Sequence, residues 1–295
     1  RKKEDFVFVS GIGCSSRFPY YMDTFGFHTI HGRAPAVASG VKLANPDLSV
    51  WVVTGDGDAL SIGGNHTIHM LRRNIDLNVM LFNNRIYGLT KGQYSPTSEV
   101  GKVTKSTPMG SLDAPFNPLS LALGAGATFV SRTLDKESKH MQDIITQSYK
   151  HRGTSFIEIY QNCNIFNDGA FSSLTDRDTK SDTVLLLEDG QPMVFGAEKN
   201  KAIRLDGNVP KVFEIGDKLT IDDALVHDKK DYVIASLLAN MTYNPDFPEP
   251  LGVFYAIDMP TYEDLMVDQI EDAIKKKPKG SVQQLLDSGD NWVVK

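Results

Sequence analysis

Two short motifs in the N-terminal part of the chain combine residues that could bind a metal ion and a diphosphate. Gly55-Asp56-Gly57 follows one apolar segment, and Asn83-Asn84 ends the next. The glycines let the backbone approach a diphosphate closely. The Asp56 carboxylate and the Asn84 amide oxygen are hard donors suited to Mg²⁺, which proteins usually bind through one or two side chains shared with phosphate oxygens. The backbone carbonyl of Ile86 could supply a third protein oxygen.

Each motif alone has an ordinary structural explanation, since Gly-Asp-Gly is a common β-turn and Asn-Asn a common start of a loop. Their shared context favours function. Both follow strand-like segments, and open α/β sheets bind ligands at the carboxyl ends of their strands. The combination therefore predicts a metal and diphosphate site at one edge of a sheet.

The elements that must position these motifs alternate between strands and helices. Uniformly apolar strands separated by helices are typical of an α/β fold with a mostly parallel sheet covered by helices on both faces. Apolar runs and glycine turns predict strands at 6–9, 50–53, 77–82, 128–130 and 155–159, and helices at 34–43, 61–73, 118–123 and 135–150.

The composition changes after about residue 166. A polar stretch rich in Asp and Lys, with short strand-like pieces, runs to about residue 230 and precedes a predicted helix at 232–240 and a Pro-rich segment at 243–250. We therefore predict a diphosphate- and magnesium-binding domain over residues 1–190 and a C-terminal extension over 191–295 that packs on it.

Composition and charge exclude several classes of partner. The 31 basic and 37 acidic residues give a formal net charge of −6, which argues against nucleic acid. No apolar run approaches the roughly 20 residues of a membrane span. The two cysteines are too few for a disulfide scaffold and indicate the reducing cytoplasm. The start of the chain lacks both an initiator Met and a secretory signal, so we expect residues upstream.

Longer stretches resemble one family. The stretches are Gly11-Ile12-Gly13-Cys14-Ser15-Ser16, His28-Thr29-Ile30-His31-Gly32-Arg33-Ala34, Gly55-Asp56-Gly57-Asp58, and Tyr87-Gly88-Leu89-Thr90-Lys91-Gly92-Gln93 with Ser95-Pro96-Thr97. They resemble the β subunit of 2-oxoacid:ferredoxin oxidoreductases, most closely those that act on 2-oxoglutarate. The resemblance covers about residues 6–170.

The resemblance implies a thiamine diphosphate-binding fold and a defined reaction. The 2-oxoacid would be oxidatively decarboxylated with coenzyme A to an acyl-CoA, here succinyl-CoA, and CO₂. Electrons would pass through a [4Fe–4S] cluster to ferredoxin, and the reaction could run backward as a reductive carboxylation.

The resemblance also assigns residues. Asp56, Asn84 and the carbonyl of Ile86 would hold Mg²⁺. Lys91 matches a position implicated in recognising coenzyme A or the 2-oxoacid, and we assign it to the catalytic site in preference to the alternative of a solvated loop lysine. Thiamine diphosphate would be lined by Ile12, Gly13, Cys14, Ser15, Thr29, Ile30, His31, Gly57, Asp58, Gly88 and Leu89.

The cysteines match two of the four cluster ligands of the family. Cys14 matches the third thiolate and Cys163 the fourth, but the Cys-x-x-Cys pair that supplies the first two is absent. Either a segment upstream of Arg1 carries that pair, or the protein holds no complete cluster. Two reduced cysteines that merely pack remain the ordinary alternative.

In the family, the glutamate that activates the cofactor comes from the other subunit, so we assign no catalytic acid or base here. We expect activity only with an α subunit, with or without a fused γ domain, in an (αβ)₂ assembly. Alternatives stay open. The substrate could be pyruvate or another 2-oxoacid, and a non-redox thiamine diphosphate decarboxylase or synthase would need no cluster cysteine. A non-catalytic subunit is disfavoured by the intact Asp56 and Asn84.

Overall fold

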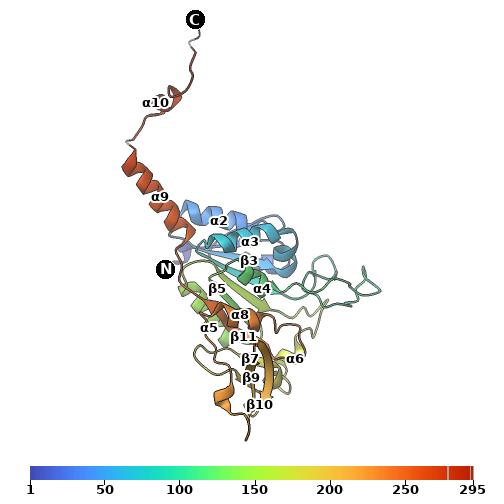
Figure 1. The fold of residues 1–295 in the computed structure, drawn as a ribbon. Helices are drawn as coiled ribbons and strands as arrows, with labels where there is room; N and C mark the ends of the chain where they lie inside the picture. The colour runs from blue at the N-terminus through green and yellow to red at the C-terminus, as the bar shows by residue number, and fades with distance from the viewer. Residues whose placement is uncertain (278, 293, 295) are drawn as a thin grey trace.

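An eight-stranded sheet forms the centre of the computed structural model, which describes residues 1–277, 279–292 and 294 (Figure 1). Its strand order is β2-β1-β3-β4-β6-β5-β11-β7. All neighbours from β2 to β5 run parallel, β11 runs antiparallel to β5, and β7 runs parallel to β11. The strands are β1 (Phe6–Ser10), β2 (Phe25–His28), β3 (Ser49–Gly55), β4 (Leu77–Asn83), β5 (Phe129–Leu134), β6 (Ser155–Tyr160), β7 (Val184–Leu186) and β11 (Glu249–Ala256).

Helices cover both faces of this sheet, and a small antiparallel sheet of order β10-β9-β8 lies below it in Figure 1. The small sheet contains β8 (Val194–Phe195), β9 (Lys201–Asp206) and β10 (Val209–Glu214). The helices are α1 (Phe18–Tyr21), α2 (Ala34–Ala44), α3 (Gly64–Arg73), α4 (Pro118–Gly124), α5 (Ser138–Lys150), α6 (Ser172–Thr175), α7 (Lys180–Thr183), α8 (Tyr232–Ala239), α9 (Tyr262–Lys276) and α10 (Val282–Leu286).

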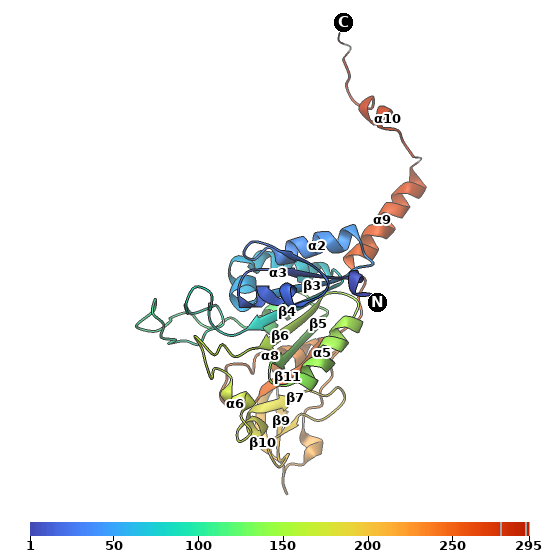
Figure 2. The same cartoon turned by 180° about the vertical axis from the view of Figure 1, so that it is seen from behind.

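The strand residues alternate between two apolar cores. Val50 and Val52 of β3 belong to the core that includes residues of α2, α3, α4 and α8, whereas Trp51 and Val53 belong to the core that includes Ile144 of α5. The view from behind shows α5 on the face of the sheet opposite α2 and α3 (Figure 2). This alternation explains why the strands read as continuous apolar runs, and it confirms the predicted α/β fold.

Most predicted elements are present with shifted ends. The predicted helix at 61–73 is divided into a π-helical turn over Asp58–Ile62 and α3. The strand predicted at 128–130 extends to Leu134, because its polar Ser131, Arg132 and Thr133 are also buried. The helix predicted from residue 135 begins at Ser138.

The sequence pattern does not predict β2 or β11. β2 is only four residues long and all four are exposed at the edge of the sheet, so the two phenylalanines Phe25 and Phe27 are too short a pattern to predict a strand. Pro250 lies near the start of β11, and proline argues against an inner strand. β11 nevertheless lies between β5 and β7. The chain beyond residue 190 therefore contributes to the main sheet, while the domain boundary itself stays a prediction.

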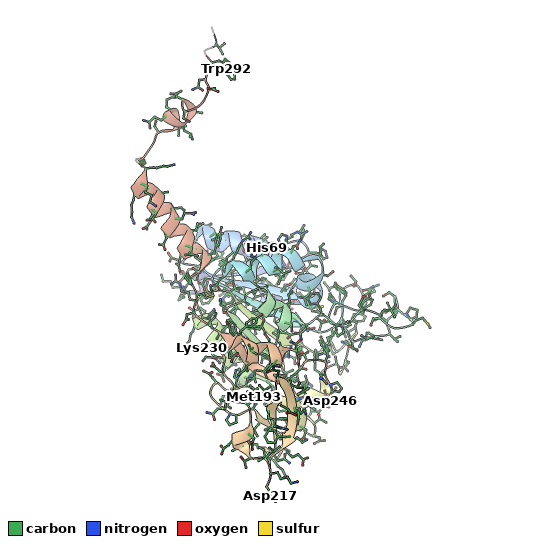
Figure 3. All side chains as sticks on the ribbon, viewed as in Figure 1. His69, Met193, Asp217, Lys230, Asp246 and Trp292 are labelled. Atoms are coloured by element: carbon green, nitrogen blue, oxygen red, sulfur yellow. The ribbon has the colours of Figure 1, made fainter. Side chains whose placement is uncertain are left out.

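The C-terminal segment projects from the body of the molecule. α9 and α10 extend away from the sheet in both views, and Trp292 lies near the far end (Figures 1, 2 and 3). Within the described ranges, no helix combines the length and the apolar character needed to cross a bilayer.

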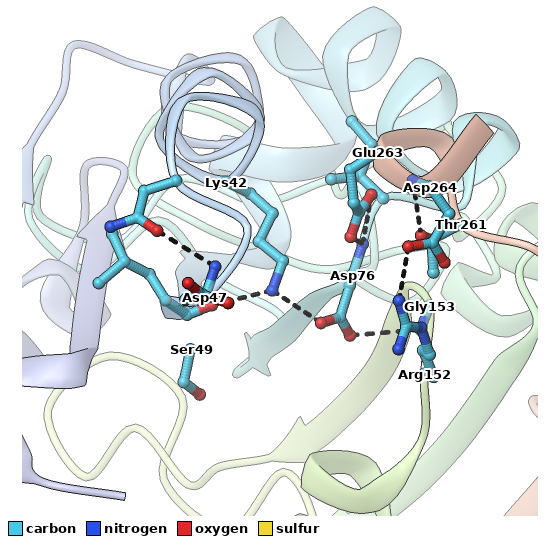
Figure 4. A network of polar contacts seen from close by, with 12 residues as sticks. Lys42, Asp47, Ser49, Asp76, Arg152, Gly153, Thr261, Glu263 and Asp264 are labelled. Atoms are coloured by element: carbon cyan, nitrogen blue, oxygen red, sulfur yellow. Dashed lines mark hydrogen bonds and ion pairs between the residues drawn. The ribbon is translucent and has the colours of Figure 1, made fainter. Parts of the chain in front are cut away.

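A polar network anchors the start of α9 at the amino ends of β3 and β4 (Figure 4). The Lys42 ammonium group is 2% exposed and donates to Asp76 Oδ2 at 2.7 Å and to the carbonyl of Leu48 at 2.9 Å. The backbone N–H of Asp76 donates to Glu263 Oε1 at 3.1 Å. Lys42 thus connects α2, the start of β4 and α9 at the end of the sheet opposite the predicted site.

Replacing Lys42 by Met should lower the free energy of unfolding by about 1.5–3 kcal/mol, because hydrogen bonds to charged groups are lost while Asp76 remains half-buried. Urea titration of the purified protein at neutral pH measures this change. The matched control is Lys211→Met, whose ion pair with Asp206 is exposed and should be worth about 0–1 kcal/mol. Equal effects of the two substitutions would contradict the structural role of Lys42.

Candidate cofactor and metal site

A cavity of about 260 Å³ opens at the carboxyl ends of β1, β3 and β4. Each of these strands is followed by a loop that contributes to its wall, as expected for a ligand site of an open α/β sheet. The cavity brings together most of the predicted site residues. It is lined by Ile12, Gly13, Cys14, Ser15, His31, Gly55, Asp56, Gly57, Asp58, Ser61, Ile62, Phe82, Asn84, Ile86, Tyr87, Gly88, Leu89, Thr90 and Gln161.

Asp56 is a buried carboxylate on the wall of this cavity, with 3% exposure. Burial raises the pKa of Asp56, while the hydroxyl groups of Ser95 and Thr97 oppose that rise by donating to Oδ2 at 2.5 and 2.6 Å. Across the described chain, no side chain donates a hydrogen bond to Oδ1. A cation beside Oδ1 would stabilise the charged carboxylate that burial disfavours.

The turn after β4 offers two more oxygens, the carbonyl of Ile86 and Oδ1 of Asn84, while its other carbonyls are already occupied. The Asn84 carbonyl accepts a hydrogen bond from Asn167 Nδ2 at 2.9 Å, and the Arg85 carbonyl accepts one from Ser98 Oγ at 2.6 Å. The carbonyl of the buried Ile86 accepts none from the described chain. Ile86 also lines the cavity, so its carbonyl is free of protein donors where a bound cation could use it. Asn84 Oδ1 accepts only the Ile86 N–H, at 3.2 Å, among described donors.

The turn is conformationally strained. Arg85 has φ of 56°, a left-handed conformation that a residue other than glycine rarely adopts. Such strain costs on the order of 1–3 kcal/mol and persists only where the surroundings impose it. Here the hydrogen bonds to the carbonyls of Asn84 and Arg85 help to impose the left-handed conformation of Arg85.

Close contacts require glycine at positions 11 and 57. A Cβ atom on Gly57 would lie 2.1 Å from the Tyr87 ring, whose hydroxyl donates to the Gly57 carbonyl at 3.2 Å. A Cβ atom on Gly11 would lie 1.8 Å from Asp58 Oδ2. Any side chain at these positions would therefore displace a wall of the cavity.

Asp58 connects the loops of the cavity wall. Its Oδ1 accepts the backbone N–H groups of Ile12 and Gly32 at 3.2 and 2.7 Å, and its Oδ2 accepts the Thr54 hydroxyl at 2.8 Å. Both oxygens are thus occupied by the protein itself. Asp58 fixes the loops after β1 and β2 to the end of β3.

Besides Cys163, three predicted site residues lie outside the lining of the cavity. The Thr29 hydroxyl donates to the Ser10 carbonyl at 3.1 Å, and Ile30 is 72% exposed. Lys91 is exposed on the loop after Tyr87, with φ of 73°. The proposed roles of these three residues stay predictions.

The two cysteines meet at Gly88. A Cβ atom on Gly88 would lie 3.3 Å from Cys14 Sγ and 4.0 Å from Cys163 Sγ, although the cysteines are far apart in the sequence. Both are free thiols, and Cys14 also lines the cavity. Among the described residues, no group of three or more His, Cys, Asp or Glu side chains could hold a metal ion. The described chain therefore supplies two adjacent thiols and no complete cluster site.

A buried polar chain leads away from Asp56. Thr97 Oγ1 lies 2.6 Å from Asp56 Oδ2 and 2.8 Å from Asn83 Oδ1, and its single proton serves one of them at a time. Asn83 Nδ2 donates to Glu158 Oε1 at 2.7 Å, and Glu158 pairs with Arg132 at 2.7 Å, both fully buried. This chain fixes the orientation of Asp56 from the centre of the sheet.

Sequence reasoning assigned no role to Ser95, Thr97, Ser98 or Asn167. Ser95 and Thr97 stand in a quoted family motif, and serine and threonine hydroxyls after a metal-ligand motif could have suggested support for its carboxylate. Asn167 gives no local signal, because it reaches Asn84 across 83 positions of sequence.

Comparisons with known proteins agree with this geometry. Residues 11–159 match the family model of the thiamine pyrophosphate enzyme C-terminal TPP binding domain. A Mycobacterium tuberculosis protein named 2-oxoglutarate oxidoreductase subunit KorB is 53% identical, covering 99% of this chain and 79% of the relative. A Sulfolobus 2-oxoacid:ferredoxin oxidoreductase subunit beta is 40% identical, covering 81% and 79%.

A solved structure is also similar. It is the 2-oxoglutarate:ferredoxin oxidoreductase from Magnetococcus marinus with 2-oxoglutarate, coenzyme A and succinyl-CoA bound, and it aligns with a TM-score of 0.77 and 32% identity, over 98% of this chain and 84% of that one. The predicted family and fold are confirmed: this chain belongs to the β subunits of the 2-oxoacid:ferredoxin oxidoreductases, within the thiamine diphosphate enzymes.

Proposed function

We propose that this chain is the β subunit of a cytoplasmic 2-oxoglutarate:ferredoxin oxidoreductase that binds thiamine diphosphate and Mg²⁺. The complex would convert 2-oxoglutarate and coenzyme A to succinyl-CoA and CO₂, pass electrons through a [4Fe–4S] cluster to ferredoxin, and work in either direction. The observation that carries the proposal is that Asp56, Asn84 and Ile86, whose carbonyl has no donor among the described residues, line one cavity. The relatives named for 2-oxoglutarate support the substrate.

The residues present fit the cofactor. Asp56, Asn84 and the Ile86 carbonyl would hold Mg²⁺, an ion that takes oxygen ligands and is commonly shared with phosphates. Gly57 lines the cavity, and the lack of a side chain there lets the Tyr87 ring pack against its backbone and shape the wall beside the diphosphate. When bound, thiamine diphosphate supplies the electron-accepting ring that allows a 2-oxoacid to lose CO₂. This chain would orient the cofactor, and we assign it no general acid or base.

The thiols beside Gly88 support a redox role. Cys14 and Cys163 would supply two of the four thiolates of a [4Fe–4S] cluster at the rim of the cofactor cavity. A non-redox thiamine diphosphate enzyme has no need for two converging thiols at this place. Pyruvate or another 2-oxoacid is the second candidate substrate, because the Sulfolobus relative is named for 2-oxoacids in general.

Large exposed apolar side chains support a partner subunit. Leu89 on the cavity wall is 54% exposed, Ile30 is 72% exposed, and Phe25 of the edge strand β2 is 63% exposed. Met109 and Leu112, in the segment between β4 and α4, are almost fully exposed. Such surfaces mark interfaces. We propose that an α subunit, with or without a fused γ domain, covers them, and that closed symmetry gives (αβ)₂.

Asp56→Asn should weaken Mg²⁺-dependent binding of thiamine diphosphate at least about 100-fold, equivalent to about 2.8 kcal/mol. The substitution keeps the shape of the side chain but removes the charge that the cation would meet. Calorimetric titration of the assembled αβ complex measures it, with the exposed Asp206→Asn as control. Unchanged affinity would remove the metal assignment.

Cys14→Ser should remove the iron of the anaerobically purified complex while thiamine diphosphate still binds. Iron analysis and low-temperature electron paramagnetic resonance, before and after adding 2-oxoglutarate with coenzyme A, measure the outcome. The unsubstituted complex should give a reduced-cluster signal that grows with substrate. A complex that binds the cofactor but contains no iron would instead favour a non-redox thiamine diphosphate enzyme.

Lys91→Ala should raise the KM for coenzyme A or for the 2-oxoacid about tenfold, the effect of losing about 1.4 kcal/mol of binding free energy. Iron content should not change, because Lys91 is not one of the proposed cluster ligands. Steady-state kinetics test this against Lys218→Ala, a second exposed lysine. Identical constants for the two variants would make Lys91 an ordinary surface residue.

A further inference from the structure

The Arg85 side chain lies among three aromatic rings. Its Cζ is 4.7 Å from the ring centre of Phe171, 4.8 Å from that of Tyr243 and 5.3 Å from that of Tyr160. The Arg85 Nε is buried and has no hydrogen-bond partner, and within the described chain the guanidinium forms no ion pair. The faces of the three rings therefore help to stabilise this half-buried positive charge.

The backbone of the same residue is the centre of the turn that carries the proposed metal ligands. Arg85 stands between Asn84 and Ile86 in a left-handed conformation. Its N–H donates to Asn83 Oδ1 at 3.2 Å. A residue held at both its backbone and its side-chain end cannot relax to an ordinary φ without moving one of its neighbours.

We call the three rings around Arg85, those of Tyr160, Phe171 and Tyr243, the ring box. Tyr243 connects the ring box to the Asp56 side of the proposed metal site. Its ring faces the Arg85 guanidinium, and its hydroxyl donates to the Thr97 carbonyl at 3.1 Å. The Thr97 hydroxyl in turn contacts Asp56. One side chain from the C-terminal part of the protein thus contacts residues that support both groups of proposed metal ligands.

We propose that Arg85, held by Tyr160, Phe171 and Tyr243, is a positioning residue for the Mg²⁺ and diphosphate site. The ring box holds the turn so that the Asn84 amide and the Ile86 carbonyl stay available to the cation. Through Tyr243, the C-terminal extension contributes to cofactor affinity. The inference rests on the proposed function, since it concerns the ligands named there.

Arg85→Asn tests this directly, because asparagine tolerates the left-handed conformation but cannot fill the ring box. The αβ complex is freed of metal with a chelator and titrated with Mg²⁺ at saturating thiamine diphosphate. The Kd for Mg²⁺ should rise about 10–100-fold, as when outer residues of metal sites are replaced. Arg152→Asn, at an exposed ion pair, is the matched control and should leave Kd unchanged.

Tyr243 gives an independent pair of variants. Tyr243→Leu removes both the ring and the hydroxyl and should weaken Mg²⁺ binding as Arg85→Asn does, whereas Tyr243→Phe keeps the ring, loses only the bond to the Thr97 carbonyl and should have a smaller effect. The thermal unfolding midpoint of each metal-free complex separates positioning from stability. A merely structural role would lower the midpoint and leave Kd unchanged.

The result for Asp56→Asn in the same titration distinguishes the two proposals. If Asp56→Asn abolishes binding while Arg85→Asn and Tyr243→Leu leave Kd unchanged, the positioning role is overturned and the proposed function stands. If Asp56→Asn also binds normally, the metal site itself is misassigned. Should Arg85→Asn fail to fold, the two Tyr243 variants decide.

Discussion

The cost of burying the Asp56 carboxylate is the constraint on which the rest of the site depends. A charged group with so little access to water is unfavourable unless hydrogen bonds or an opposite charge compensate it. The fold supplies two hydroxyl donors to one of its oxygens and leaves the other without a side-chain donor. The protein thus balances only part of the charge, and the remainder favours a cation at the cavity.

The polar chain behind Asp56 extends this constraint into the sheet. Arg132 pairs with both Glu158 and Glu249, and it lies 4.8 Å from the Tyr160 ring centre. Arg85 contacts the same ring, while the Tyr160 hydroxyl donates to Glu249 at 3.0 Å. Arg132 and its two glutamates therefore form one buried cluster beside the Tyr160 ring, and Arg85 contacts that ring from outside the cluster. Removing Arg132 would leave the buried Glu158 carboxylate unpaired, which costs far more than an exposed pair contributes.

The sequence permits prediction of features that are local. Apolar runs predict the parallel strands, and the spacing of Gly55-Asp56-Gly57 and Asn83-Asn84 predicts where the cavity lies. The residues that hold the ligands in place are less accessible to prediction. Asn167 and Tyr243 reach the site from remote segments, and the left-handed Arg85 has no marker in its own side chain. β11 is hidden by Pro250 and by the polar stretch before it.

The place of β11 in the sheet has a consequence for synthesis of the protein. Glu249 follows its partner Arg132 by 117 residues, so at typical rates of translation Arg132 and Glu158 wait on the order of ten seconds for the second carboxylate. Until then, the edge of β5 that pairs with β11 has no neighbour, and the ring box around Arg85 lacks Tyr243. The motifs that identify the cofactor site emerge early from the ribosome, but the site is completed only when the last strand is added. A nascent chain arrested before that strand would expose an open sheet edge and invite aggregation or capture by chaperones.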